Sequence, residues 1–375
     1  MDRSLNLENL NKAMEQAGLS QTSLAKQLKV SKEAVSKWLS GNKFPRPDKL
    51  LRLGLTLGLS MEELVTRAVD PAEPVIAFRK RGAAKTTATH IAQAKDMGRL
   101  LSALVSYLPY DQFVQPATLK KPVLDYDYIQ QVAAKIRMEI GVGGKEELTF
   151  AHLIKKFNEL QAVIIPVMWG KKDKHENALH IYLPESMTTW VYLNLDVEAH
   201  DFKFWMAHEL SHVYTPELRG NEAEDFADAL AGALLLPSIL AGNAYREVAR
   251  VRTEKGHIGK IRELAGCFSI SMISVYREIN TYAKHHGLPE ISLGNNLYGA
   301  NTNHNKQFQT ISETLFDEKA PDARQFIHTS AEVFGTPFFD TLKAYLAEYR
   351  KSPGFVQSIL DTPLLDAKGI HAELS

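Results

Sequence analysis

The stretch from Gln21 to Gly41 constrains the fold of the chain more than any other, because turn signals divide it into two very short helices. Ser20 precedes the first helix as an N-cap, and Ser31 caps the second helix after a tight turn. Apolar residues recur at helical spacing on both sides of that turn. They are Leu24, Ala25, Leu28, Val30, Val35 and Trp38. We therefore predict helices at 21–28 and 32–39 that pack around a small shared core.

The residues around this pair predict a small domain of five helices, residues 1–69. Gly18 ends the first helix, Asp48 begins the fourth, and Ser60 with Glu63 forms a capping-box pattern for the fifth. Two short helices around a tight turn are typical of a helix-turn-helix, which places its second helix in the major groove of DNA. The alternative is a helical bundle that serves only protein contacts.

The distribution of charge favours nucleic-acid binding at this end of the chain. The 375 residues contain 44 basic and 44 acidic side chains, but residues 1–99 hold 17 basic and 10 acidic ones. The remainder is therefore acidic, and a net charge of zero does not exclude DNA binding. A second basic cluster follows the predicted domain and includes Arg79, Lys80, Arg81 and Lys85.

The segment from Gln21 to Gly41, QTSLAKQLKVSKEAVSKWLSG, closely resembles the Cro-type (XRE) repressor domain. The resemblance covers about 60 residues, and such domains bind pseudo-palindromic double-stranded DNA as homodimers. It implies that Gln21 contacts a phosphate and that exposed residues of the second helix contact bases or backbone. The implied DNA-binding residues are Gln21, Ser31, Lys32, Glu33, Ser36 and Lys37.

The rest of the chain predicts an α+β architecture that is predominantly α-helical. We expect a basic linker and connecting helix at 70–122, and a domain with a small sheet at 123–290. A helical region of unknown role follows at 291–375. The N-terminus has no apolar signal core, and the longest uncharged stretch, 229–245, has 17 residues and contains a proline. We therefore expect no membrane span and a cytoplasmic location.

The strongest chemical signal is the motif AHELSH, which places His208, Glu209 and His212 in a run that reads as a helix. Histidines four residues apart lie on one helix face, so both imidazoles can bind one Zn²⁺ ion. Glu209 then reaches a water on the metal and acts as the catalytic base. The alternative is a pair of surface histidines on an amphipathic helix. The single cysteine, Cys267, excludes a Cys-rich zinc site, and we expect it in the core.

A zinc site of this kind needs a third protein ligand. Four carboxylates follow at suitable distance, namely Glu222, Glu224, Asp225 and Asp228. In a helix over 221–236, Glu222 shares a face with the apolar Phe226, whereas Glu224 points away and is expected to be solvated. We therefore choose Glu222. His200 is a weaker candidate because it precedes the motif helix, and Tyr214 is a candidate to stabilise the oxyanion.

Three segments together, TWVYLNL at 189–195, the helix that ends at His212, and EAEDFA followed by LLLP at 222–237, resemble the ImmA/IrrE family of metallopeptidase-like domains. The similarity extends from about Asp125 to Leu288. It implies a zincin-like domain in which His208, His212 and Glu222 bind zinc and Glu209 is the base.

These features support two hypotheses of different classes. The first is a DNA-binding regulator whose zinc-dependent peptidase domain cleaves a partner protein in a phage, stress-response or toxin–antitoxin setting. The second is a non-enzymatic repressor or antitoxin whose metal domain binds a ligand or a toxin. In the first hypothesis the 189–195 strand could also bind an extended peptide by strand addition.

Overall fold

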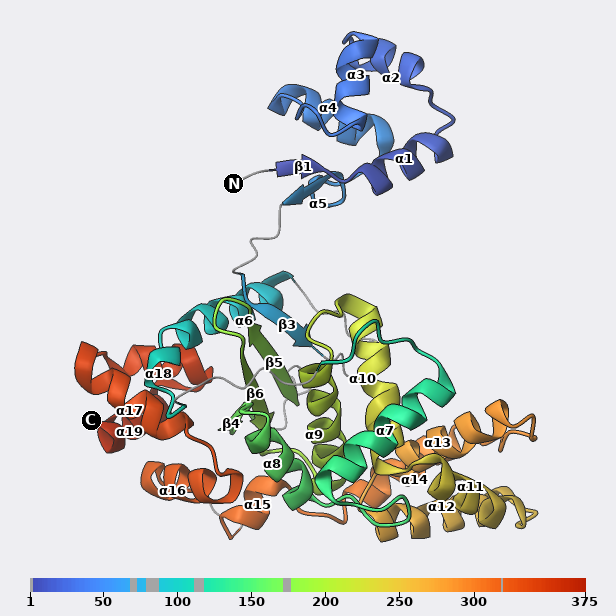
Figure 1. Cartoon of the computed structure of the whole chain (residues 1–375), viewed down its shortest axis with the longest axis vertical. Helices are drawn as coiled ribbons and strands as arrows, with labels where there is room; N and C mark the ends of the chain where they lie inside the picture. The colour runs from blue at the N-terminus through green and yellow to red at the C-terminus, as the bar shows by residue number, and fades with distance from the viewer. Residues whose placement is uncertain (1–2, 68–72, 79–87, 111–117, 171–176, 318–319) are drawn as a thin grey trace. The chain divides into compact units, whose positions relative to one another are not determined.

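The computed structural model describes residues 3–67, 73–78, 88–110, 118–170, 177–317 and 320–375. The chain forms two compact units, Met1–Pro71 and Ala72–Ser375, and each is described by itself (Figure 1). The basic cluster around Arg79 lies outside the described residues.

The first unit contains the five predicted helices and a short antiparallel ribbon that the sequence did not indicate. Serines cap the helices as predicted: Ser31, for example, accepts a hydrogen bond from the backbone N–H of Ala34. Trp38 is buried in the shared core, as predicted. The elements are β1 (Arg3–Leu5), α1 (Leu7–Gln16), α2 (Gln21–Leu28), α3 (Lys32–Leu39), α4 (Pro47–Leu57), α5 (Met61–Leu64) and β2 (Val65–Arg67).

The second unit is built on a four-stranded sheet with the order β3-β5-β6-β4. These strands are β3 (Val75–Phe78), β4 (Val163–Val167), β5 (Ala178–Leu183) and β6 (Thr188–Asn194). β5 is antiparallel to both of its neighbours, whereas β4 is parallel to β6. Every residue of β4 and β6 is buried, because helices cover both faces of the sheet.

Helices of the second unit lie on either side of this sheet (Figure 1). The helices before the motif region are α6 (Ala88–Ser102), the 3₁₀ turn η1 (Val105–Tyr107), α7 (Tyr126–Ile140) and α8 (Phe150–Glu159). The helices that follow in the sequence are α9 (Ala199–Tyr214), α10 (Gly220–Leu235), α11 (Ser238–Ala249), α12 (Glu254–Phe268) and α13 (Met272–His285). The last group is α14 (Asn296–Asn305), α15 (Ile311–Leu315), α16 (Ala323–Phe334), α17 (Phe338–Tyr349), α18 (Pro353–Leu360) and α19 (Leu364–Leu374).

The C-terminal helices belong to the same hydrophobic core as the sheet. The hydroxyl of Tyr192 on β6 donates to the carbonyl of Ile359, and the indole of Trp169 donates to that of Leu360. The contacts therefore join the regions predicted as 70–122, 123–290 and 291–375 into one unit that begins at Ala72.

The turn between α12 and α13 repeats the local geometry of the turn between α2 and α3. Ser269 has φ 51° and Lys29 has φ 53°, and a capping serine follows each after one apolar residue. In the second unit, however, the buried face of α13 packs on α11, so this helix pair is part of the core. Cys267 on α12 is exposed, and the expectation that it lies in the core was wrong.

A buried arginine holds the end of α10 in place. The guanidinium of Arg137, only 1% exposed, donates to the carbonyl of Leu234 at 2.5 Å and to that of Gly143 at 2.7 Å. It also donates to the carbonyl of Glu146. Because the last carbonyls of a helix lack partners within it, this contact satisfies one of the free carbonyls at the end of α10.

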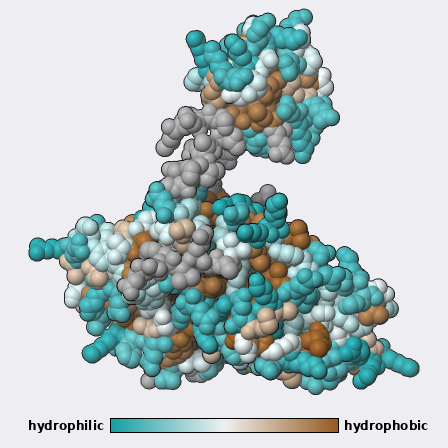
Figure 2. All heavy atoms as spheres, in the orientation of Figure 1, coloured by the Kyte–Doolittle hydropathy of each residue, from teal (hydrophilic) through white to brown (hydrophobic). Residues whose placement is uncertain are grey.

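Hydrophobic side chains are exposed on the surface of both units, among a larger number of hydrophilic ones (Figure 2). Within the described residues, no single helix is long and apolar enough to cross a membrane; α10 and α11 reach that composition only as a pair, with a 75° bend between them.

Candidate metal centre and nucleic-acid interface

The motif helix α9 is buried along most of its length, and its polar residues are buried with it. His208 is 0% exposed, Glu209 1% and His212 3%. The two histidines lie one turn apart, as predicted, and their Nε2 atoms are 3.1 Å apart. Two imidazole nitrogens that face each other at this distance in the core need a polar partner between or beside them.

The carboxylate that lies beside this pair is Glu224, and not Glu222, which the sequence analysis selected. The Oε2 atom of Glu224 lies 3.4 Å from Nε2 of His208, and its Oε1 atom lies 3.6 Å from Nε2 of His212. In the part of the chain that the structure describes, His208, His212 and Glu224 are the group of three potential ligands whose atoms lie within 4.8 Å of one another. Glu222 is exposed to solvent.

Glu224 lies beside the histidines in place of Glu222 because of the rotation of α10 about its axis. Its buried stripe consists of Ala223, Phe226, Ala227 and Leu230, so Glu222 falls outside it. Glu224 and Asp228 lie one turn apart at the edge of this stripe that faces α9. Each helix thus contributes two polar side chains with the same spacing, and the two pairs meet.

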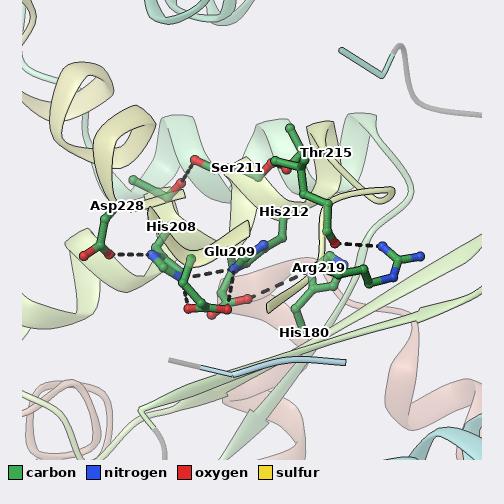
Figure 3. Close-up of polar contacts among 11 residues, drawn as sticks. His180, His208, Glu209, Ser211, His212, Thr215, Arg219 and Asp228 are labelled. Carbon is green, nitrogen blue, oxygen red and sulfur yellow. Dashed lines mark hydrogen bonds and ion pairs between the residues drawn. The ribbon is translucent and has the colours of Figure 1, made fainter. Parts of the chain in front are cut away.

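Asp228 orients the imidazole of His208 (Figure 3). Its Oδ1 atom lies 3.0 Å from Nδ1 of His208, and a carboxylate only accepts hydrogen bonds. Nδ1 therefore carries a proton, and Nε2 faces Glu224. Burial lowers the pKa of His208, but the hydrogen bonds to Asp228 and Glu224 outweigh it and raise this pKa to about 9. Without a metal the site therefore holds a proton on His208.

His180 on β5 is a further residue of the site, and the sequence analysis missed it. It is 2% exposed, and its Nδ1 atom lies 4.0 Å from Oε2 of Glu209 (Figure 3). Burial, with the neighbouring His208 and Arg219, lowers the pKa of His180 to about 3. The apolar run ALHIYL at 178–183 was the available signal, because a histidine inside a buried strand requires a polar environment.

Tyr214 does not face this group, contrary to the oxyanion prediction. Its hydroxyl donates to Oε2 of Glu139 on α7 at 3.2 Å, and Lys156 binds the same carboxylate at 3.1 Å. His200 also differs from expectation, because it lies inside α9 in its first turn and not before the helix.

The predicted DNA-binding residues form one exposed surface of the first unit. Gln21 begins α2, and Ser31 to Lys37 span the turn and the exposed face of α3. All six side chains are exposed, namely Gln21, Ser31, Lys32, Glu33, Ser36 and Lys37. Lys29 ends α2 in the left-handed conformation, which sets the angle between the two helices.

Comparison with known proteins identifies this first unit. Residues 10–64 match the helix-turn-helix family model. The unit is therefore a helix-turn-helix domain of the XRE type, and the chain is a DNA-binding transcriptional regulator. No curated protein matches the chain.

We predict that metal-free protein loses stability as the pH falls from about 7 to about 5. Burial holds the pKa values of His180, His200 and His212 below the ordinary value near 6.5, so only the unfolded chain takes up these protons. Each such histidine adds a slope of up to ~1.4 kcal/mol per pH unit to the free energy of unfolding. The pKa of His208 is raised to about 9, so this residue acts in the opposite sense and offsets part of the loss above about pH 6.5, where the unfolded histidine is largely neutral.

Urea unfolding of chelator-treated protein at both pH values measures this effect. The His180→Gln variant should show a shallower pH dependence than the wild type. His328→Gln is the matched control, because that side chain is 80% exposed. Equal slopes for wild type and His180→Gln would contradict the prediction.

We also predict that DNA binding weakens steeply with salt and that the Lys32→Ala/Lys37→Ala variant has a lower salt dependence. A lysine that contacts a phosphate releases about one counterion on binding, so each one lost reduces the slope of log K against log[salt] by about 1. Fluorescence anisotropy with a nonspecific duplex measures the slope. Lys12→Ala on α1 is the control and should leave it unchanged; an unchanged slope in the double variant would count against α3 as the DNA-contacting helix.

Proposed function

We propose that this regulator carries a zinc-dependent peptidase-like domain in its second unit, with His208, His212 and Glu224 as metal ligands and Glu209 as general base. The convergence of three potential ligand atoms within 4.8 Å, two of them from buried histidines, carries the proposal. The resemblance of the motif segments to the ImmA/IrrE family supports it, with Glu224 in the place of Glu222.

The donor set fits zinc. Two imidazole nitrogens and one carboxylate oxygen are typical of catalytic zinc sites, which keep a fourth position open. The Oε2 atom of Glu224 is buried and, among the described residues, makes only the 3.4 Å contact with Nε2 of His208, so a cation could take the place of the proton between them. Asp228 would orient one of these ligands without binding the metal, since zinc-binding histidines commonly donate their second N–H to a carboxylate. When bound, zinc would polarise the scissile carbonyl and make water a stronger acid.

The chain's own residues then provide the proton transfers. Glu209 follows His208 directly and lies between α9 and β5, where its carboxylate can accept a proton from water and deliver it to the leaving amine. His180 faces Glu209 and is neutral at pH 7, because its pKa is about 3. A neutral imidazole can donate a hydrogen bond to a developing oxyanion, so we assign to His180 the role first considered for Tyr214.

A peptide substrate would bind at the edge of the sheet formed by β3. The strand 189–195 was the first candidate for strand addition, but β6 is paired on both sides, with β4 and β5. Among the described strands, β3 has a neighbour only in β5, and Ala77 on β3 lies opposite His180. A peptide paired with β3 would therefore be separated from His180 only by β3 itself. We propose a protein substrate or toxin partner in a phage, stress-response or toxin–antitoxin setting.

An exposed apolar strip on the first unit supports a homodimer. Leu51 and Leu55 on α4 are one turn apart and are 58% and 76% exposed, and Met61 on α5 is 47% exposed. Apolar side chains that gather on a helix face and remain in water favour association with a second copy. A dimer would match a pseudo-palindromic operator.

We predict that Glu224→Gln loses at least tenfold in zinc affinity, whereas Glu222→Gln keeps the wild-type value. The loss follows from removing a negatively charged ligand, and Glu222 is a matched control two residues away on the same helix. Competition with a chromogenic chelator measures both affinities. The reverse result would restore the assignment of Glu222, and equal affinities in both variants would argue against α10 as the source of a ligand.

We predict that Glu209→Gln retains zinc but loses peptide cleavage by a factor of about 10² or more, because an amide cannot accept the proton from water. Mass spectrometry of a proteome-derived peptide library, and of the products of neighbouring genes, measures cleavage. Cleavage that survives in Glu209→Gln would show that another group is the base. Zinc binding with no cleavage by the wild type would instead favour the non-enzymatic regulator.

A further inference from the structure

Two histidines from distant parts of the second unit meet in a second buried cluster. His200 lies in the first turn of α9, and His304 lies in the last turn of α14. Their ring centroids are 5.4 Å apart, and the ring planes make an angle of 78°. His200 is 4% exposed and His304 is 5% exposed.

The four ring nitrogens of this pair are buried and have no hydrogen-bond partner. A neutral imidazole carries one N–H donor and one acceptor, and a buried polar group without a partner has a free-energy cost. Protonation does not relieve this cost, because burial, together with the other histidine and Lys203, lowers the pKa of His200 to about 4. Phe308 closes the cluster with a ring centroid 3.8 Å from that of His200. The described residues thus leave both histidines in need of a ligand.

Two amide oxygens of α14 are also buried without a hydrogen-bond partner. The Oδ1 atoms of Asn301 and Asn305 are buried without a hydrogen bond. Asn305 uses its Nδ2 group on Asp201, at 3.5 Å, and this leaves its oxygen free. Asn301, His304 and Asn305 are three and four residues apart, so they share one face of α14. α9 therefore contributes one histidine whose nitrogens lack partners, and α14 contributes a second such histidine and two amide oxygens.

We propose that this cluster is a second metal site, which takes a divalent transition ion of the kind that imidazole binds, such as Zn²⁺. His200 and His304 would be its nitrogen ligands, and Asn301 or Asn305 would supply an oxygen. The geometry of the pair resembles that of His208 and His212, whose ring centroids are 4.8 Å apart at an angle of 76°. Imidazole with oxygen ligands is a donor set that zinc and nickel accept.

The site would fasten the end of α14 to the start of the motif helix. The segment after α14 already crosses there, because the N–H of Ile311 donates to the carbonyl of Val197 at 3.1 Å and Thr310 pairs with Glu198 in an isolated bridge. His200 precedes His208 by eight residues, about 12 Å along the helix axis. The second site therefore uses none of the ligands of the first, and it stands whether or not the second unit is a peptidase.

Metal counting on the full-length chain tests the proposal. Chelator-stripped protein is titrated with Zn²⁺ alone, and bound metal is measured by mass spectrometry after gel filtration. The wild type should hold two equivalents. The His304→Leu and His200→Gln variants should each hold one equivalent, at the His208 site. The Glu224→Gln variant should still bind one at the His200–His304 site. His328→Leu, at an exposed position, should hold two.

Thermal unfolding provides a second readout that does not depend on counting. The His304→Leu substitution removes an unsatisfied buried polar group, so the metal-free variant should unfold at the wild-type temperature or above, with a smaller rise on addition of Zn²⁺. Full metal retention and an unchanged zinc-induced shift in folded His304→Leu and His200→Gln would overturn the proposal. A wild type with one equivalent that His304→Leu loses would support this site and refute the one at His208.

Discussion

The second unit depends on one costly arrangement, a helix that carries ionisable side chains through the middle of the hydrophobic core. α9 buries His208, Glu209 and His212 almost completely, and each would be destabilising without a polar partner. Its neighbours bring polar groups to them: α10 places Glu224 and Asp228 beside the histidines, and β5 places His180 4.0 Å from Glu209. The packing of α9 against α10 and the sheet is therefore also what assembles the candidate site.

The sequence predicted the features that are set by neighbouring residues. Capping serines and the spacing of apolar residues located α2 and α3, and the i, i+4 spacing located the histidine pair. The choice between Glu222 and Glu224 was different, because both lie on α10 and only its rotation against α9 separates them. His180 was missed because a strand pairing determines which residues of β5 reach Glu209.

The C-terminal helices also show that contacts between distant parts of the chain cannot be predicted from local sequence. They carry no motif, yet the hydroxyl of Tyr192 on the central strand finds its acceptor at Ile359, 167 residues further along the chain. Thr336 makes a similar bond to the carbonyl of Ile164 on β4. Contacts of such long sequence separation leave no local signal. They join a region that reads as an appendage in the sequence to the core of the second unit.

The exposed position of Cys267 on α12 has a chemical consequence. Because the chain has no second cysteine, any disulfide that forms must join two separate molecules. A disulfide between two copies of the chain would link them through α12, on the second unit, and would not involve the apolar strip of α4 on the first. Handling the protein under reducing conditions keeps these two kinds of association apart, and the same thiol offers a single position for attaching a spectroscopic label.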